Sequence, residues 1–265
     1  MNVPCDVQIE MKKNEPQNSA RVMLITGATS GFGESTAYHA AQAGFQLILT
    51  GRRQDRLNAL KVAVGPAVLM ILVFDVRDRE ATANALASIP DDWIPDVLVN
   101  NAGLAVGKEP LDEGLYEDWD RMIDTNVKGL LHVSRELAPR MRFGSRIINM
   151  GSIAGRQAYG GGAVYNASKF AVVGLTQAMR IDLLPRGIQV SEVAPGAAKT
   201  EFSNVRFKGD AQMAEDVYQG FEPLSSQDVA EAVMFIADRP QHVCIQEILI
   251  APVAQASVNQ IRKQL

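Results

Sequence analysis

The sequence is poor in cysteine, in aromatic residues and in unbalanced charge. Its 265 residues include two cysteines, 6% aromatic residues and a formal net charge of −4. Two cysteines cannot build a disulfide framework, which favours a reducing compartment, so we expect a cytoplasmic protein. The slight excess of negative charge argues against nucleic acid as a main partner.

Long apolar runs are also missing. The most apolar run, residues 62–74, is too short to span a bilayer and is interrupted by Gly65 and Pro66. Residues 1–20 are polar and lack the continuous apolar core of a signal peptide. We therefore expect no membrane segment, a disordered extension over residues 1–20, and one folded domain over residues 21–265.

What the chain does contain is a regular alternation of apolar runs and amphipathic segments. Strand-like runs are found at 21–26, 45–50, 67–74, 96–100, 145–150, 188–193 and 244–250. Several are apolar at nearly every position, which is typical of strands covered on both faces. Helices are predicted at 32–44, 52–65, 78–89, 116–143 and 163–184. This order predicts an α/β fold with a doubly wound parallel sheet of seven strands.

A glycine-rich turn stands between the first predicted strand and the first predicted helix. Its glycines are Gly27, Gly31 and Gly33. Such a turn presents free backbone N–H groups and the positive end of a helix dipole, which together bind a diphosphate. The glycines allow the tight turn and let phosphates approach the backbone. The alternative is an ordinary structural turn.

The end of the second strand indicates which dinucleotide the chain binds. An acidic residue there would bind the ribose 2′-hydroxyl of NAD, but this sequence has Arg52 and Arg53. A guanidinium suits a phosphate, so we expect NADP, with one of the two arginines on its 2′-phosphate. The alternative is a solvated basic helix start, which the helix dipole disfavours.

Small and polar residues end the third and fourth strands. Asp75 is placed to accept from the adenine amino group, and the backbone of Val76 to donate to the base. Asn101, Ala102 and Gly103 follow the fourth strand, where small residues let the chain pass close to a ribose. All of these types are also ordinary turn formers, which is the alternative interpretation.

Four further residues carry reactive chemistry. Ser152 follows the fifth strand, Tyr165 and Lys169 lie one turn apart on the next helix, and Asn126 lies in the long helix before that strand. Reducing a carbonyl needs a hydride, which the cofactor supplies, and a proton, which a phenol can supply. The free phenol has a pKa of about 10, and we expect the Lys169 cation to lower it. Ser152 would hold the substrate oxygen by a hydrogen bond. Asn126 would hold a water that replaces the proton through Lys169.

Together these pieces resemble the short-chain dehydrogenases/reductases. The matched residues are 26–33, 100–103, Asn126, Ser152, Tyr165, Lys169, Pro195, Gly196 and Thr200. The resemblance implies a Rossmann sheet ordered 3-2-1-4-5-6-7, a small-molecule substrate, a homotetramer and no metal. It also implies cofactor contacts from Gly27, Thr29, Ser30, Gly31, Phe32, Gly33, Asp75, Val76, Asn101, Ala102, Gly103, Tyr165, Lys169, Pro195, Gly196 and Thr200.

Residues 200–210 resemble more narrowly the NADP-dependent 3-hydroxy acid dehydrogenases, which act on serine, allo-threonine and related acids. Such substrates carry a carboxylate, which calls for a cation. Arg206 is the candidate, with Arg156 as the second, and a solvated surface charge is the alternative. The stretch after Gly196 is one residue shorter than that resemblance implies, which leaves the substrate open.

Three other functions share parts of this pattern. The first is a broader NADPH-dependent reductase of ketones or aldehydes. The second is an epimerase or dehydratase, whose glycine spacing and C-terminal region usually differ from those of this chain. The third is a dinucleotide sensor without catalysis, which would be expected to lack Tyr165 or Lys169.

Overall fold

The computed structural model describes residues 20–264, so the predicted disorder of residues 1–19 lies outside the described residues. The strands are β1 (Val22–Ile25), β2 (Gln46–Gly51), β3 (Val68–Val73), β4 (Val97–Asn100), β5 (Arg146–Met150), β6 (Gln189–Pro195) and β7 (Glu247–Ile250). The helices are α1 (Gly31–Gln42), α2 (Gln54–Val64), α3 (Arg79–Ala87), α4 (Tyr116–Ile123), α5 (Leu130–Leu137), α6 (Ala163–Asp182), α7 (Phe202–Arg206), α8 (Ala211–Asp216) and α9 (Ser226–Ala237).

The strands form one parallel sheet of seven, in the order β3-β2-β1-β4-β5-β6-β7, as predicted. Ile25 on β1 pairs with Leu49 on β2 on one side and with Val99 on β4 on the other. The chain therefore runs outward from β1 in both directions. The place where it reverses, between β1 and β4, opens a crevice at the C-terminal strand ends, where ligands bind in such sheets.

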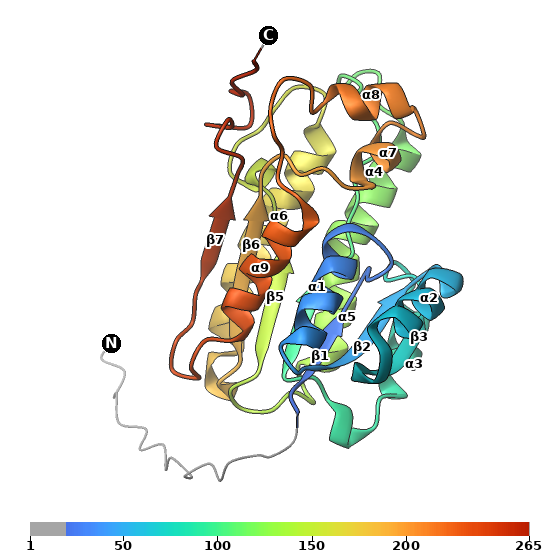
Figure 1. Ribbon diagram of the computed structural model, residues 1–265, viewed down its shortest axis with the longest axis vertical. Coiled ribbons are helices and arrows are strands. Elements are labelled where there is room, and N and C mark those ends of the chain that lie inside the picture. The colour runs from blue at the N-terminus through green and yellow to red at the C-terminus, as the bar shows by residue number, and fades with distance from the viewer. Residues whose placement is uncertain (1–19, 265) are drawn as a thin grey trace.

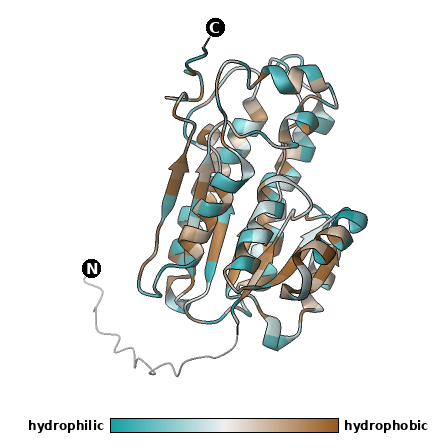
Figure 2. Ribbon diagram, in the orientation of Figure 1, coloured by the Kyte–Doolittle hydropathy of each residue, from teal (hydrophilic) through white to brown (hydrophobic). Residues whose placement is uncertain are grey.

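Both faces of the sheet are covered by helices (Figure 1). One core joins the sheet to α1, α2 and α9, and the other joins it to α3, α5 and α6. Consecutive residues of one strand pack into the cores on opposite faces of the sheet, because successive side chains point to opposite faces. Leu24 and Ile25 do so, and both are fully buried. Figure 2 shows the result as apolar strands between helices with polar outer faces. Burying each such side chain stabilises the fold by about 1.5–3 kcal/mol relative to leaving it in water.

The structure corrects the predicted helices in two places. Helix α9 was not predicted, although Ser225 and Asp228 form a capping box at its start. The predicted helix over 116–143 ends at Leu137, and the π-helical turn Asp124–Gly129 interrupts it.

The stretch between β6 and α9 contains two short helices. Helices α7 and α8 lie beyond the C-terminal ends of the strands, at the top of Figure 1. Helix α7 lines the crevice between β1 and β4 with Phe202 and Val205, and α8 lines a neighbouring cavity with Met213 and Asp216. Within residues 20–264 no helix is long and apolar enough to cross a membrane. The same residues hold no His, Cys, Asp or Glu cluster suited to a metal ion.

Candidate active site

The glycine turn forms the floor of a groove between β1 and β4. Gly27 and Gly31 have φ of +64° and +56°, which favour glycine. Gly33 has ordinary φ, but a Cβ there would lie 2.5 Å from Nδ2 of Asn101. The turn is thus pressed against the end of β4. Helix α1 begins at Gly31, and the side chain of Ser30 does not cap it, so its first N–H groups face the groove.

This groove has a volume of about 270 Å³ and brings together most of the predicted cofactor residues. Those lining it are Gly27, Thr29, Ser30, Gly31, Phe32, Arg52, Arg53, Asp75, Val76, Asn101, Ala102, Gly103, Tyr165, Lys169 and Thr200. Pro195 and Gly196 line a second cavity instead. Gly33 lines neither, because it packs behind the turn.

The two arginines after β2 differ in how firmly they are held. Arg53 donates to Oγ1 of Thr29 at 2.7 Å and to Oγ of Ser30 at 3.0 Å, so it lies over the glycine turn. It also pairs with Glu201, just before α7, at 3.2 Å. Arg52 is half exposed and lies 3.4 Å from Asp75. Arg53 is therefore preorganised beside the groove, and Arg52 is free to turn toward it.

Glu201 joins the segment around α7 to the region after β2. Besides Arg53, its carboxylate accepts from Arg56 on α2 at 2.7 Å. Hydrogen bonds from Arg56 and Arg53 hold the pKa of Glu201 below its usual range, although partial burial works the other way. The start of α7 is thus tied to the arginines beside the groove.

The polar residues at the ends of β3 and β4 have structural contacts of their own. Asp75 accepts from Nη2 of Arg77 at 2.7 Å. Burial raises its pKa, but the hydrogen bonds from Arg77 and the charge of Arg52 hold it below the usual range. Asn101 donates to the backbone oxygen of Thr26 at 2.8 Å and so braces β4 against β1.

Ser152, Tyr165 and Lys169 are brought together at the C-terminal end of β5, and all three are buried. Ser152 starts the 3₁₀ turn η4 (Ile153–Gly155) and accepts from the N–H of Ala154 at 3.1 Å. Tyr165 lies near the start of α6 and packs edge-on against Phe202 of α7, with ring centroids 5.6 Å apart. Its hydroxyl therefore lies between the groove and the second cavity, since Tyr165 lines both.

The expectation that Lys169 lowers the pKa of Tyr165 is wrong for this structure. Burial raises the pKa of Tyr165 well above its usual value, and Tyr159 adds to the rise. Ser152 and Arg206 work against it. Lys169 is not among the groups that shift the pKa of Tyr165. Its Nζ lies 5.9 Å from the centroid of the Tyr165 ring and donates to the backbone oxygen of Met150 at 2.8 Å.

Lys169 has a perturbed pKa of its own. Burial lowers it from the usual 10.5 to about 8, and the carboxylate of Glu192 opposes the fall. An amine with a pKa near neutrality suits a group that passes protons.

Asn126 lies in the π-helical turn between α4 and α5. Its Oδ1 accepts from the N–H of Leu104 at 2.8 Å, and its Nδ2 donates to the oxygen of Leu104 at 2.8 Å and to Ser168 at 3.0 Å. Such turns interrupt helices frequently at functional sites. Here the turn carries the amide of Asn126 to the segment after β4, close to Gly103 and Lys169.

The second cavity, of about 560 Å³, lies on the other side of Tyr165. Arg206 lines it and lies over the ring of Tyr159, with Cζ 5.1 Å from the centroid. Among residues 20–264, Nε and Nη2 of Arg206 are buried without a hydrogen-bond partner. Buried N–H groups of a guanidinium are costly to leave unpaired. The geometry therefore points to an anion that Arg206 is built to receive.

The structure does not bring Arg156 into this cavity, contrary to the sequence expectation. Its guanidinium is occupied by Glu192 at 2.8 Å and Glu247 at 2.9 Å. Lys208 also points elsewhere, pairing with Asp118 at 2.7 Å.

Sequence reasoning missed residues whose position depends on contacts between distant segments. Tyr159 and Phe202 line the second cavity, and Glu192 faces Arg156 from β6. Glu192 carried a signal, since it is the one charged residue in the strand-like run 188–193.

A crevice at the strand reversal with a tyrosine–lysine pair at its mouth defines a dinucleotide-dependent oxidoreductase. Residues 21–211 match the family model described as short chain dehydrogenase, and the chain belongs to that family.

Named relatives extend over nearly the whole chain. It is 46% identical over 239 residues to NADP-dependent 3-hydroxy acid dehydrogenase YdfG of Escherichia coli (strain K12), covering 89% of this chain and 96% of the relative. It is 40% identical over 237 residues to serine 3-dehydrogenase of Rhizobium radiobacter, covering 88% and 94%. Among solved structures, the closed form of serine dehydrogenase complexed with NADP⁺ aligns with a TM-score of 0.86 at 43% identity, covering 92% of this chain and 100% of that one.

Proposed function

We propose that this protein is an NADP-dependent dehydrogenase of small 3-hydroxy acids such as serine, allo-threonine and 3-hydroxypropionate. The observation that carries the substrate class is the guanidinium of Arg206. Arg206 is half-buried, its Cζ lies 5.9 Å from the centroid of the Tyr165 ring, and its buried Nε and Nη2 have no partner within residues 20–264. A carboxylate is the planar acceptor that a guanidinium fork binds best. The names of the relatives support the same substrate class.

The residues of the first groove fit NADP. The glycine turn and the N-terminus of α1 would hold the diphosphate, and Arg53 with Arg52 the 2′-phosphate. Asp75 and Val76 would contact the adenine, and Lys169 the nicotinamide ribose. When bound, the cofactor supplies or accepts the hydride.

The protein's own residues handle the proton and the substrate oxygen. Ser152 donates a hydrogen bond to the substrate oxygen, and Tyr165 holds or releases the proton at its hydroxyl. Because burial raises the pKa of Tyr165, the phenol is protonated at neutral pH and ready to act as an acid in reduction. In reduction Lys169, with a pKa of about 8, would return a proton toward Tyr165 from the water that Asn126 would hold.

One observation favours a second candidate function, a reductase of larger ketones or aldehydes. The second cavity of about 560 Å³ is lined in part by Met213, Val217 and Ile261. Apolar lining of this kind stabilises substrates with an apolar extension.

The test follows nicotinamide absorbance with L-serine, L-allo-threonine and 3-hydroxypropionate, each with NADP and with NAD. Turnover of a hydroxy acid with NADP supports the proposal. If none reacts while NADPH is oxidised by neutral ketones or aldehydes, the second function replaces it. Tyr165→Phe is the matched control, because it removes only the reacting hydroxyl.

We also propose a homotetramer in the cytoplasm. Exposed apolar side chains on α5, α6 and β7 support an assembly, among them Leu131, Phe170 and Leu249. The low cysteine content supports the compartment. Light scattering in solution and cell fractionation test the two parts separately.

A further inference from the structure

The carboxylate of Glu192 is buried near Lys169, and the mechanism proposed above gives it no role. Glu192 is on β6 and is 2% exposed. An ionised carboxylate at this depth needs a partner, because taking a charge out of water is costly. Arg156, which follows η4, is that partner. Its Nη2 donates to Oε2 of Glu192 at 2.8 Å and its Nη1 to Oε1 at 3.3 Å.

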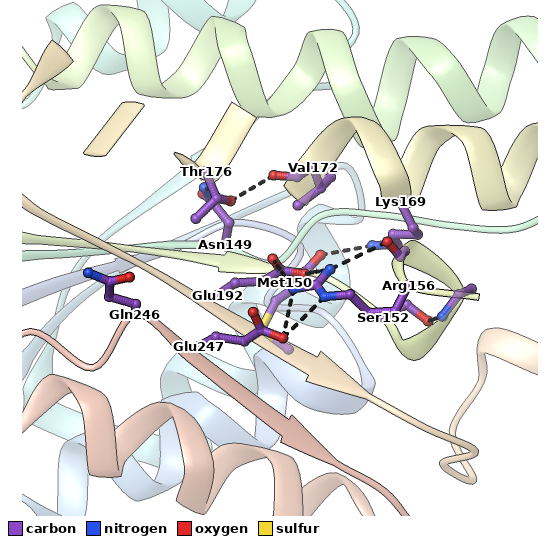
Figure 3. A network of polar contacts seen from close by, with 12 residues as sticks. Asn149, Met150, Ser152, Arg156, Lys169, Val172, Thr176, Glu192, Gln246 and Glu247 are labelled. Carbon is purple, nitrogen blue, oxygen red and sulfur yellow. Dashed lines mark hydrogen bonds and ion pairs between the residues drawn. The ribbon is translucent and has the colours of Figure 1, made fainter. Parts of the chain in front are cut away.

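The same guanidinium also reaches β7, where it lies 2.9 Å from Oε1 of Glu247. The cluster thus holds one cation and two carboxylates, and its net charge is negative. Figure 3 shows Arg156 between these two carboxylates. The side chain of Glu247 is 43% exposed and that of Glu192 only 3%. Water therefore screens Glu247, whereas the field of Glu192 acts through the protein interior.

Lys169 and Glu192 contact consecutive residues, Met150 at the end of β5 and Gly151 after it; Figure 3 shows Lys169 beside Met150. Nζ of Lys169 donates to the backbone oxygen of Met150 at 2.8 Å. The next residue, Gly151, has no room for a Cβ, because Oε1 of Glu192 fills that position. One peptide unit therefore separates the amine from the carboxylate. The glycine before Ser152 is required by this close approach.

We propose that Glu192, held in place by Arg156, is a positioning residue that keeps Lys169 protonated at neutral pH. Glu192 is not among the residues of 20–264 that line the two cavities, so it acts through Lys169 rather than on substrate or cofactor. The inference rests on the proposed oxidoreductase activity for its kinetic readout only.

The electrostatic sign follows from this geometry. Burial lowers the pKa of Lys169 to about 8, and Glu192 is the group that opposes the fall. Of the other charged or titratable groups, Arg156 and Glu247 lie on the Glu192 side, and Tyr165 lies on the Lys169 side, with Nζ 5.9 Å from its ring centroid. Tyr159 and Arg206 act on Tyr165. Removing the negative charge of Glu192 makes the protonated amine less favourable. Lys169 must then lose its proton at a lower pH.

The first experiment titrates Lys169 directly in the full-length protein without turnover. The protein is labelled with ¹³C at the ε-carbon of lysine, and Lys169→Arg assigns the resonance. Glu192→Gln should lower the pKa of Lys169 by on the order of one pH unit. Glu192→Asp keeps the charge and should leave that pKa near the native value. Glu247→Gln is the matched control, because it removes the exposed carboxylate that pairs with Arg156. It should also leave the pKa of Lys169 near the native value.

The second experiment measures kcat/KM against pH with whichever alcohol the native enzyme oxidises. The limb that rises with pH should move to lower pH in Glu192→Gln by the same amount, and stay in place in Glu192→Asp. A variant that only disturbs packing would lower kcat and leave the limb where it was. If the native enzyme oxidises no alcohol, the proposed function fails, and the NMR titration still decides the role of Glu192.

A Lys169 pKa that does not move in Glu192→Gln overturns the inference, whatever happens to activity. If that variant does not fold, Arg156→Gln replaces it. Without Arg156 the buried carboxylate of Glu192 loses the partner that keeps it ionised and in place, so the Lys169 pKa must fall in this variant too. A Lys169 pKa that stays the same or rises in Arg156→Gln refutes the proposal.

Discussion

Replacing Lys169 with methionine removes a buried positive charge, and we expect the variant to be more stable than the native protein at neutral pH although it loses turnover. The pKa of Lys169 falls from 10.5 in a solvated lysine to about 8 in the fold. At 1.36 kcal/mol per unit, burying the charge costs about 3 kcal/mol. Methionine fills a similar volume but loses the hydrogen bond to Met150, which is worth about 1 kcal/mol.

The net gain of about 2 kcal/mol has a definite pH dependence. Below pH 8 Lys169 is protonated in both the folded and the unfolded chain, so the full cost is present. Between pH 8 and 10.5 the unfolded chain binds more protons than the folded one, and the native protein gains stability as pH rises. The advantage of Lys169→Met should therefore shrink through this range.

Thermal unfolding of the two proteins at pH 7 and at pH 10 measures both effects. At pH 7 the variant should unfold about 4–8 °C above the native protein, and at pH 10 the difference should be much smaller. Lys169→Arg is the control, since it keeps a charge at the site. A variant less stable than the native protein at pH 7, or a difference independent of pH, would refute the burial argument.

Three further predictions concern catalysis and binding. Tyr165→Phe should bind NADPH normally and lose turnover, since only the proton-carrying hydroxyl is removed; fluorescence titration and steady-state kinetics separate the two. Replacing Arg52 and Arg53 together with alanine should weaken the binding of NADPH by at least about 10-fold and leave the binding of NADH unchanged. The reason is that hydrogen bonds to a phosphate are charge-assisted and are worth about 1.5–3 kcal/mol. Arg206→Met should raise KM for a hydroxy acid by about 10- to 100-fold, with kinetics toward a neutral ketone unchanged.

Matched controls make these outcomes decisive. Arg56→Ala removes a guanidinium that pairs with Glu201 but does not itself line the groove, so it should leave the preference between NADPH and NADH intact. If the double variant of Arg52 and Arg53 weakens the binding of NADPH and NADH equally, these arginines do not bind the 2′-phosphate. Equal losses on the acid and on its methyl ester in Arg206→Met contradict a role in binding the carboxylate.

The strands could be predicted because their signal is local, whereas the order of the sheet came from the family resemblance. Leu98 and Val99 are apolar neighbours, and each is buried on a different face of the sheet. Side-chain pairing across the fold is not local. Arg156 and Glu192 are 36 residues apart in the sequence, and no periodicity shows that one neutralises the other. Sequence spacing therefore could not show that Arg156 is engaged by two carboxylates and does not line the second cavity.

The state of Tyr165 could not be predicted from spacing either. A lysine four residues later lies on the same face of a helix, but the direction of its amine depends on what that amine bonds. In the fold Lys169 turns to Met150, so burial rather than a neighbouring cation dominates the pKa of Tyr165.

The π-helical turn at Asp124–Gly129 also fixes the rotational phase of the helix that follows it. A single residue corresponds to about 100° of rotation around a helix axis. Deleting one residue from the turn, so that it closes as ordinary helix, would swing α5 by that angle and carry Val133 and Leu137 away from the core. The number of residues in this turn is therefore as strongly constrained as their identity. An insertion or deletion there would damage the site and the core together.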